Sequence, residues 1–268
     1  MKKTGRRGFV LKLLKNNCAN KTLFWLFVLI CFFSQASFAQ RLEFDYTKET
    51  LSNGQLNLSY KYILVSELPD NTFVLGLLFS DYNNNKNKDV LVSLGVYHNF
   101  SQALYLYVNG TYNTSPSLLV SSAFEAEVGY SVAKPWVFVA NYKRRNFLQS
   151  FLDTYSPGLD YYLPFPGWIS ARYYVSKASD STMSNSSSIK LFYEPNDFAR
   201  IYLGYASGNE AYKDISLATT FAFNSTTTMA GIKIELKKGL SLKLDISREI
   251  RDNGVTGLST NYGVAYQW

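Results

Sequence analysis

The chain has 268 residues, of which 47% are hydrophobic and 16% aromatic, with 27 Lys and Arg against 20 Asp and Glu. Seven of the bases and none of the acids fall within residues 1–39, so the rest of the chain carries 20 of each and no net charge. This balance argues against nucleic acid as a partner, because the excess positive charge belongs to the N-terminus alone.

Residues 1–39 are predicted to be a cleaved signal peptide. A basic leader without acids precedes an apolar run from Leu23 to Phe33. Ser37 and Ala39 then place small residues where a signal peptidase cleaves, before Gln40. The apolar run has eleven residues, whereas a membrane-spanning helix needs about 20, which disfavours a permanent helical anchor. We therefore expect export from the cytoplasm.

Cysteine and histidine usage limits the chemistry open to the rest of the chain. The two cysteines, Cys18 and Cys31, both lie in the predicted signal peptide, and His98 is the single histidine. We expect no cofactor and no metal site, because the usual Cys and His ligands are missing. His98 lies beside a predicted short turn at Phe100, where a polar residue at the membrane interface is the simpler interpretation than a catalytic base.

Residues 40–268 are predicted to form one all-β domain, because apolar and polar residues alternate with period two almost throughout. Every second residue from Leu240 to Ile246 is aliphatic, and most of the intervening ones are polar. A soluble barrel would turn the apolar face inward, and a membrane barrel would turn it toward lipid. Segments of about 9 to 12 residues and abundant Tyr favour a transmembrane antiparallel up-and-down β-barrel of the outer membrane.

The last strand carries an expected assembly signal. Outer-membrane barrels typically end in a strand whose lipid-facing residues are apolar and whose final residue is aromatic, usually Phe; here it is Trp. We expect this strand to be read by the barrel assembly machinery and the finished barrel to contact outer-membrane lipids. The signal residues are Tyr262, Val264, Tyr266 and Trp268.

Connections between strands alternate in length, which predicts short periplasmic turns and longer extracellular loops. Fifteen segments qualify as strands, but single-chain bacterial barrels have an even number. Ile215–Asn224 alternates weakly, so we assign it to an extracellular loop and predict about fourteen strands. The predicted longer loops are Asn83–Lys88, Thr114–Leu118, Asn146–Asp153, Ser179–Ser187, Gly208–Thr227 and Arg251–Thr256.

The polar parity of the strands is predicted to place charged side chains in the lumen, which could be a narrow aqueous passage because fourteen strands enclose more space than eight. Glu125 and Glu127 would lie about 6.5 to 7 Å apart, a spacing compatible with a glycosidase pair. An ion-pair lattice with neighbouring bases is the interpretation we favour. The predicted lumenal residues are Glu43, Asp45, Lys61, Glu125, Glu127, Lys143, Arg145, Arg172, Lys190, Arg200, Lys233, Glu235, Lys243 and Asp245.

Four short segments resemble the YaiO family of outer-membrane barrels: Glu127–Tyr130, Tyr155–Tyr162, Ala171–Tyr174 and Leu203–Glu210. The resemblance covers roughly residues 120–268 and implies an outer-membrane location, without catalytic or binding residues to transfer. Relatives are associated with surface polysaccharide. We therefore expect a channel or export-associated barrel for surface polysaccharide. A structural or adhesive barrel with a closed lumen, or a glycan hydrolase, remains an alternative.

Overall fold

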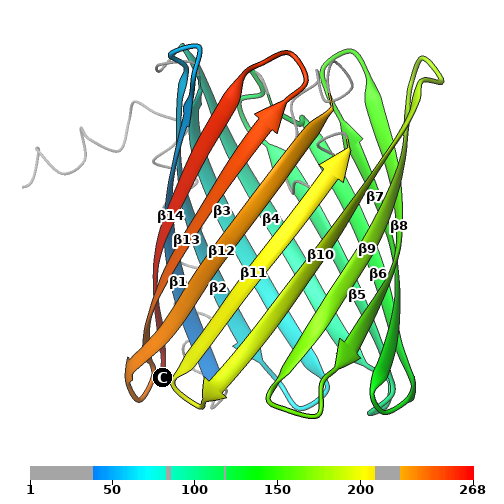
Figure 1. The fold of residues 1–268 in the computed structure, drawn as a ribbon, viewed down its shortest axis with the longest axis vertical. Helices are drawn as coiled ribbons and strands as arrows, with labels where there is room; N and C mark the ends of the chain where they lie inside the picture. Colours follow the sequence, from blue (N-terminus) through cyan, green and yellow to red (C-terminus); the bar gives the residue numbers. More distant parts are fainter. Residues whose placement is uncertain (1–38, 83–85, 118, 209–223) are drawn as a thin grey trace, which may run out of the picture. The chain divides into compact units, whose positions relative to one another are not determined.

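The computed structural model describes residues 39–82, 86–117, 119–208 and 224–268. These residues form fourteen strands that close into one barrel, in which each strand pairs antiparallel with its neighbours in sequence and β14 pairs with β1 (Figure 1). The predicted architecture and the strand number are confirmed. The strands are β1 (Ala39–Leu51), β2 (Leu56–Glu67), β3 (Asn71–Tyr82), β4 (Asn87–Asn99), β5 (Leu104–Asn113), β6 (Ser122–Ala133), β7 (Trp136–Asn146), β8 (Phe151–Tyr162), β9 (Gly167–Ala178), β10 (Met183–Asn196), β11 (Ala199–Gly208), β12 (Ser225–Lys237), β13 (Leu240–Arg251) and β14 (Thr256–Gln267).

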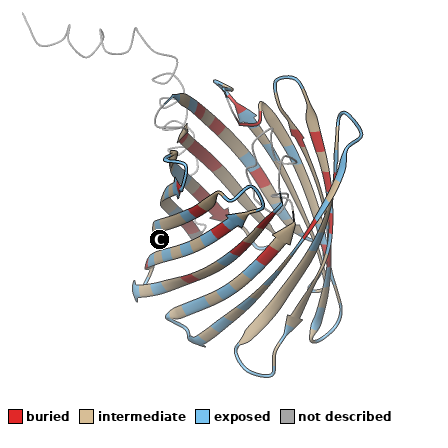
Figure 2. Ribbon diagram, turned by 45° about the horizontal axis from the view of Figure 1, so that its top comes forward, coloured by how far each residue is buried: buried red, intermediate tan, exposed pale blue. Residues whose placement is uncertain are grey.

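The strand register turns the large apolar side chains outward. Leu94, Phe138 and Leu203 are 57%, 52% and 58% exposed, which would be costly over a whole surface in water but suits a lipid environment. Buried residues fall as short bands along the strands and do not form a central layer (Figure 2). No helix among the described residues is long and apolar enough to span a membrane.

Glycines on the inward face make room for large side chains on the next strand. A Cβ added at Gly129 would lie 1.9 Å from the Tyr105 ring, and one at Gly158 would lie 2.2 Å from the Arg172 side chain. The large side chain therefore lies flat over its strand neighbour, a packing that only glycine permits. Gly129, Gly158 and Arg172 belong to the segments that carry the family resemblance, so these motifs encode packing inside the barrel.

Several predicted loops are shorter than expected, because strands extend into their ends. Within the predicted loop Ser179–Ser187, β10 already begins at Met183, and within Asn146–Asp153, β8 begins at Phe151. The polar residues Ser184–Ser188 give no hydrophobic alternation, yet they form strand because β9 supplies backbone hydrogen-bond partners.

The remaining turn between β9 and β10 is closed by Asp180, which accepts a hydrogen bond of 2.9 Å from the Thr182 backbone N–H. This bond lowers the pKa of the Asp180 carboxyl group. The adjacent Ser181 has a φ of 70°, which is consistent with a tight turn. Two other predictions cannot be compared with the fold, since residues 1–38 and 209–223 lie outside the described residues; they hold nearly all of the signal peptide and of Ile215–Asn224.

The inward glycines provide a stability test. We expect Gly129→Val to lower the unfolding free energy by about 2 kcal/mol, because the added side chain must displace Tyr105 from a packed position. Gly110→Val is the matched control, since nothing lies within 4 Å of its added Cβ. Urea unfolding of the barrel refolded into vesicles measures both, and equal stability of the two variants would contradict this account of the packing.

Candidate functional site: the barrel interior

The register puts all fourteen predicted lumenal residues at positions that alternate with the exposed apolar ones, on the face turned to the interior. They gather into small groups across neighbouring strands. Glu125 accepts from Lys143, with Nζ 3.2 Å from Oε2, and from Asn141 Nδ2 at 2.8 Å. Glu127 accepts from the Tyr105 hydroxyl at 2.9 Å and from Asn141 Nδ2 at 3.3 Å. The two carboxylates thus share one amide and each has a further donor.

A second group on β8 and β9 pairs Arg172 with Asp160. The two guanidinium NH2 groups donate to the two carboxylate oxygens at 2.7 and 3.1 Å, a bidentate geometry that fixes both side chains. Each side chain is only 18% exposed. Lys190 lies on the adjacent strand β10, opposite Gly204 in the register. It lies two residues nearer the periplasmic end than the β10 position opposite Arg172.

A third group crosses the seam where β1, β13 and β14 meet. Lys243 Nζ lies 3.0 Å from Asp245 and 3.9 Å from Asp45. Asn261 donates to Asp245 at 3.0 Å, and Lys61 lies opposite Asp45 in the β1–β2 register. Two acids and two bases therefore alternate across the seam.

Except for Arg145, the remaining predicted residues lie near the periplasmic end, where the short turns are. Glu43 pairs with Arg41 at 2.6 Å, and Arg200 donates to Glu194 at 2.6 Å. Arg200, Lys233 and Glu235 line a cavity of ≈ 580 Å³ beside the β10–β11 turn. These pairs are more exposed than the central ones, so each contributes little to stability.

The extracellular mouth holds a feature that the sequence prediction missed. Asp89 on β4 is 1% exposed, and both of its carboxylate oxygens accept hydrogen bonds. Oδ1 accepts from the Asn113 side chain at 2.8 Å and the Ser117 backbone at 2.7 Å. Oδ2 accepts from the Ser117 hydroxyl at 3.1 Å and the Leu119 backbone at 3.2 Å. We call this arrangement the Asp89 latch.

The latch holds the connection after β5 inside the mouth. Leu119 and Val120 are 2% and 3% exposed and pack on Leu78 and Leu91 of the inward face. The prediction placed residues 114–118 in an ordinary surface loop, and Leu119 and Val120 follow it directly. The structure shows that this connection folds inward, because its apolar end finds an apolar patch on β3 and β4 and its backbone finds the Asp89 carboxylate.

Arg145 lies below the same mouth and is also 1% exposed. Its NH2 group donates to the Thr154 hydroxyl at 3.1 Å, and Thr154 shares a hydrogen bond of 2.9 Å with Ser176. The sequence predicted the inward direction of Arg145 but not this depth of burial. Another unpredicted pair, Glu249 with Arg251, lies on the inward face of β13 with an oxygen-to-nitrogen distance of 3.1 Å.

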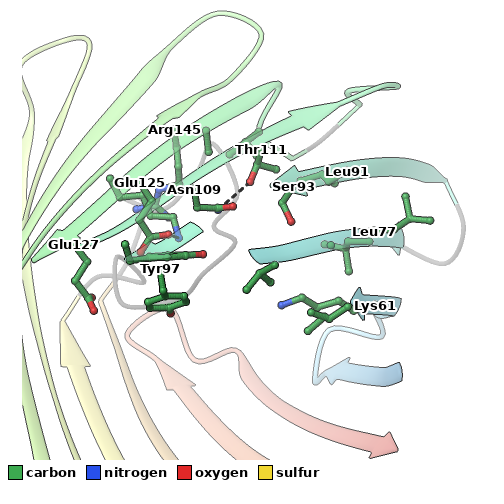
Figure 3. A pocket seen from close by; sticks show the side chains of 18 residues that line it. Lys61, Leu77, Leu91, Ser93, Tyr97, Asn109, Thr111, Glu125, Glu127 and Arg145 are labelled. Atoms are coloured by element: carbon green, nitrogen blue, oxygen red, sulfur yellow. Dashed lines mark hydrogen bonds and ion pairs between the residues drawn. The ribbon is translucent and has the colours of Figure 1, made fainter. Parts of the chain in front are cut away.

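Within the barrel, the described residues line two cavities that matter here. One, of ≈ 340 Å³, is lined by side chains of β2 to β7, among them Lys61, Tyr97, Asn109 and Glu125 (Figure 3). The other, of ≈ 460 Å³, is lined by Asp45, Lys243 and neighbours around the seam, and also by Lys61. Their walls carry charges of both signs, hydroxyl groups and amides, together with aliphatic side chains such as Leu78, which lines both. This lining suits water and hydrophilic solutes.

Other predicted sites have simpler surroundings. His98 Nδ1 lies 2.9 Å from the Asn71 side-chain oxygen, and its ring packs edge-on against Phe100 at 4.4 Å. Three residues of the expected assembly signal, Tyr262, Val264 and Tyr266, lie on the outward face of β14, and Trp268, which follows the strand, stacks on Tyr266 at 5.9 Å. Among the described residues no cluster of three or more His, Cys, Asp or Glu could hold a metal ion.

A closed antiparallel barrel that is apolar outside and ionic inside is an outer-membrane β-barrel protein. The chain belongs to the YaiO family, because the model of the YaiO membrane beta barrel domain matches residues 39–213. The resemblance seen in the sequence and the outer-membrane location are thereby confirmed. A search among curated proteins found no significant match.

Solved structures with a similar fold are outer-membrane barrels of several kinds. The CymD monoaromatic hydrocarbon channel is 10% identical, with a TM-score of 0.56, 86% of this chain covered and 87% of that one. A bacterial polysaccharide outer membrane secretin is 8% identical, with a TM-score of 0.55 and coverage of 85% and 98%. The outer membrane protein Omp33 of Acinetobacter baumannii is 9% identical, with a TM-score of 0.52 and coverage of 87% and 100%. At these identities the likeness shows the fold alone.

The Asp89 latch predicts how the mouth responds to substitution. Asp89→Asn keeps the shape but replaces one acceptor oxygen by a donor amide, which faces the Ser117 or Leu119 donors. Hydrogen bonds to a charged group contribute about 1.5 to 3 kcal/mol each. We therefore expect the population of the inward-folded state to fall by a factor of about 10 or more. A Leu119→Cys reporter should then react at least that much faster with a membrane-impermeant thiol reagent.

Asp81→Asn is the control, since Asp81 is an acid at the same end of the barrel that faces outward near Lys88. Any labelling of Cys18 and Cys31 is measured in the chain without the Leu119→Cys substitution and is subtracted. Equal labelling rates in Asp89→Asn and the parent would show that Asp89 does not hold the connection.

Proposed function

We propose that this barrel is a narrow channel for hydrophilic solutes across the outer membrane, with a surface polysaccharide or its fragments as the solute. The observation that carries the proposal is the pair of cavities, ≈ 340 and ≈ 460 Å³, that lie within the barrel and are lined by charged residues of both signs. Both are lined by Lys61 and Leu78, so the two cavities adjoin each other there.

The lining favours a glycan over the hydrocarbon carried by a channel of the same fold. Its charges are largely paired, as in Lys143 with Glu125 and Lys243 with Asp45, so a neutral polyhydroxylated solute can bind without leaving a charge unpaired. An apolar solute would instead displace water from these groups and offer no hydrogen bonds in return. Tyr97 and Tyr107 add a stacked aromatic pair at 4.1 Å beside the first cavity, against which a sugar ring could pack.

The family association with surface polysaccharide and the fold shared with a polysaccharide secretin agree with this proposal and do not identify the solute. We assign no catalytic role to Glu125 and Glu127, because Lys143, Tyr105 and Asn141 already engage them as donors. The exposed aromatic end of β14 supports recognition by the barrel assembly machinery as a further proposal.

Lys61 gives the channel proposal a measurable consequence. We expect wild-type protein to carry single-channel current in planar bilayers, and Lys61→Glu to move the reversal potential in a salt gradient toward cation preference, because the side chain borders both cavities. Lys177→Glu makes the same charge change on the outward face and should leave the reversal potential unchanged.

The inward-folded connection at the mouth favours one competing function, a structural or adhesive barrel with a closed lumen. Its apolar residues, Leu119 and Val120, occupy space that a solute would need. The bilayer measurement separates the two functions. An absence of current in the wild type and in Asp89→Asn, at any voltage, would remove the channel and leave the closed barrel.

A further inference from the structure

The lipid-facing surface is charged at one end only. The strand register assigns five bases and two acids to outward positions that alternate with the apolar ones. Each lies within four residues of the extracellular end of its strand. They are Lys48, Asp81, Lys88, Arg144, Asp153, Lys177 and Arg248.

The periplasmic half has the opposite character. Its outward positions carry aliphatic and aromatic side chains such as Leu42, Trp136 and Tyr266. Aside from Lys237, which ends β12 after a register shift, no charged residue takes an outward position in this half of the described strands. Random scatter of surface charge would not spare one half of all fourteen strands, so the asymmetry matches a difference between the two leaflets.

The outward bases outnumber their acidic neighbours. Lys88 lies 3.7 Å from Asp81 and Arg144 lies 3.8 Å from Asp153. Lys48, Lys177 and Arg248 are exposed and make no salt bridge within the described part of the chain, although Lys177 lies opposite Asp153 in the register. A base on the lipid face is costly near the bilayer midplane and cheap at the interface, where its long stem can reach the headgroups. There an anionic headgroup is its natural partner.

Lys48 and Arg248 form the most open of these positions. They flank β14, with Lys48 opposite Thr260 and Arg248 opposite Leu258, so about two strand spacings, or roughly 10 Å, separate their backbones. Neither Thr260 nor Leu258 is acidic. The gap therefore carries two positive charges and a hydroxyl group, with aliphatic surface toward the membrane.

The corresponding gap between Arg144 and Lys177 is built differently. Asp153 lies between them in the register and takes a hydrogen bond of 2.8 Å from the Tyr142 hydroxyl. The Arg144 guanidinium also lies over the Phe151 ring, 4.2 Å from its centroid. Asp153 thus partly neutralises Arg144 and Lys177, and Arg144 is already in contact with a ring of the protein itself.

We propose that Lys48 and Arg248 form a docking site for a phosphate-bearing lipid headgroup of the outer leaflet. The headgroup phosphate lies between the two side chains across β14, and the acyl chains lie along the apolar strand surface below. The other outward bases extend this site into a basic collar at the level of the headgroups. The proposal is independent of whether the lumen conducts.

Native mass spectrometry of the detergent-purified barrel with added diphosphoryl lipid A tests the site. Each base near a charged membrane surface contributes enough that loss of two should weaken retention of the lipid roughly thirtyfold. We expect that loss in Lys48→Gln with Arg248→Gln, and nearly full retention in the swap Lys48→Arg with Arg248→Lys. Heat-dependent gel mobility shows whether each variant is folded.

Three comparisons make the result decisive. Lys190→Gln with Lys233→Gln removes two bases from the inward face, and this variant should retain the lipid. If it lost the lipid as fully as the Lys48 and Arg248 variant, net charge alone would explain the result and the site would be overturned. Wild-type protein should not retain the same lipid without its phosphates, and equal retention would overturn the proposal even if the double variant fails to fold. Inorganic phosphate that displaces lipid A at matched concentration would show a free-anion site instead of a lipid site.

Discussion

The whole structure depends on one constraint, that no backbone N–H or C=O can be left without a partner inside a bilayer. Strands meet it only if the sheet has no edge. Here the closing contact is the pairing of β14 with β1, which runs from Arg41 opposite Gln267 to Leu51 opposite Gly257. Gln40 and Trp268 extend it with two backbone hydrogen bonds of 3.2 and 3.0 Å. Closure then divides every strand into a face toward lipid and a face toward the interior, and all other features follow from that division.

The inward face must solve a problem that the outward face does not have. Ionised groups that leave bulk water are stabilised only if they are paired and hydrogen-bonded. The pairs Arg172–Asp160 and Lys143–Glu125 meet this condition across adjacent strands, where opposite residues are close neighbours. Glycines at Gly129 and Gly158 allow the long side chains to lie along the wall, so that they make these contacts without filling the lumen.

Period-two alternation carried most of this information in the sequence. It predicts the inward side of Glu125, Arg172 and Lys243, because parity is a local property that closure cannot change. The strand number follows only when the even count of single-chain barrels is added, since alternation alone yields fifteen segments. It fails where polarity is uniform, as in Ser184–Ser188 near the start of β10, where no apolar residue marks the strand. It also fails for the Asp89 latch, since the carboxylate and the Leu119 backbone are 30 positions apart and only the three-dimensional fold brings them together. Alternation assigns Asp89 a side of the strand but no partner.

Parity also explains how the two faces come to differ at the extracellular end. Lys48 and Glu49, Lys88 and Asp89, and Arg248 and Glu249 are adjacent in sequence, so in each pair the base faces lipid and the acid faces the interior. The acids then engage Asn57, the inward-folded connection and Arg251 inside the mouth. A one-residue slip of any of these strands would put a carboxylate among anionic headgroups and a base into the mouth. The base–acid order therefore fixes the register at this end, where the apolar alternation is weakest. The same two-residue sequence places an acid in the packed mouth and a base on the membrane-facing surface.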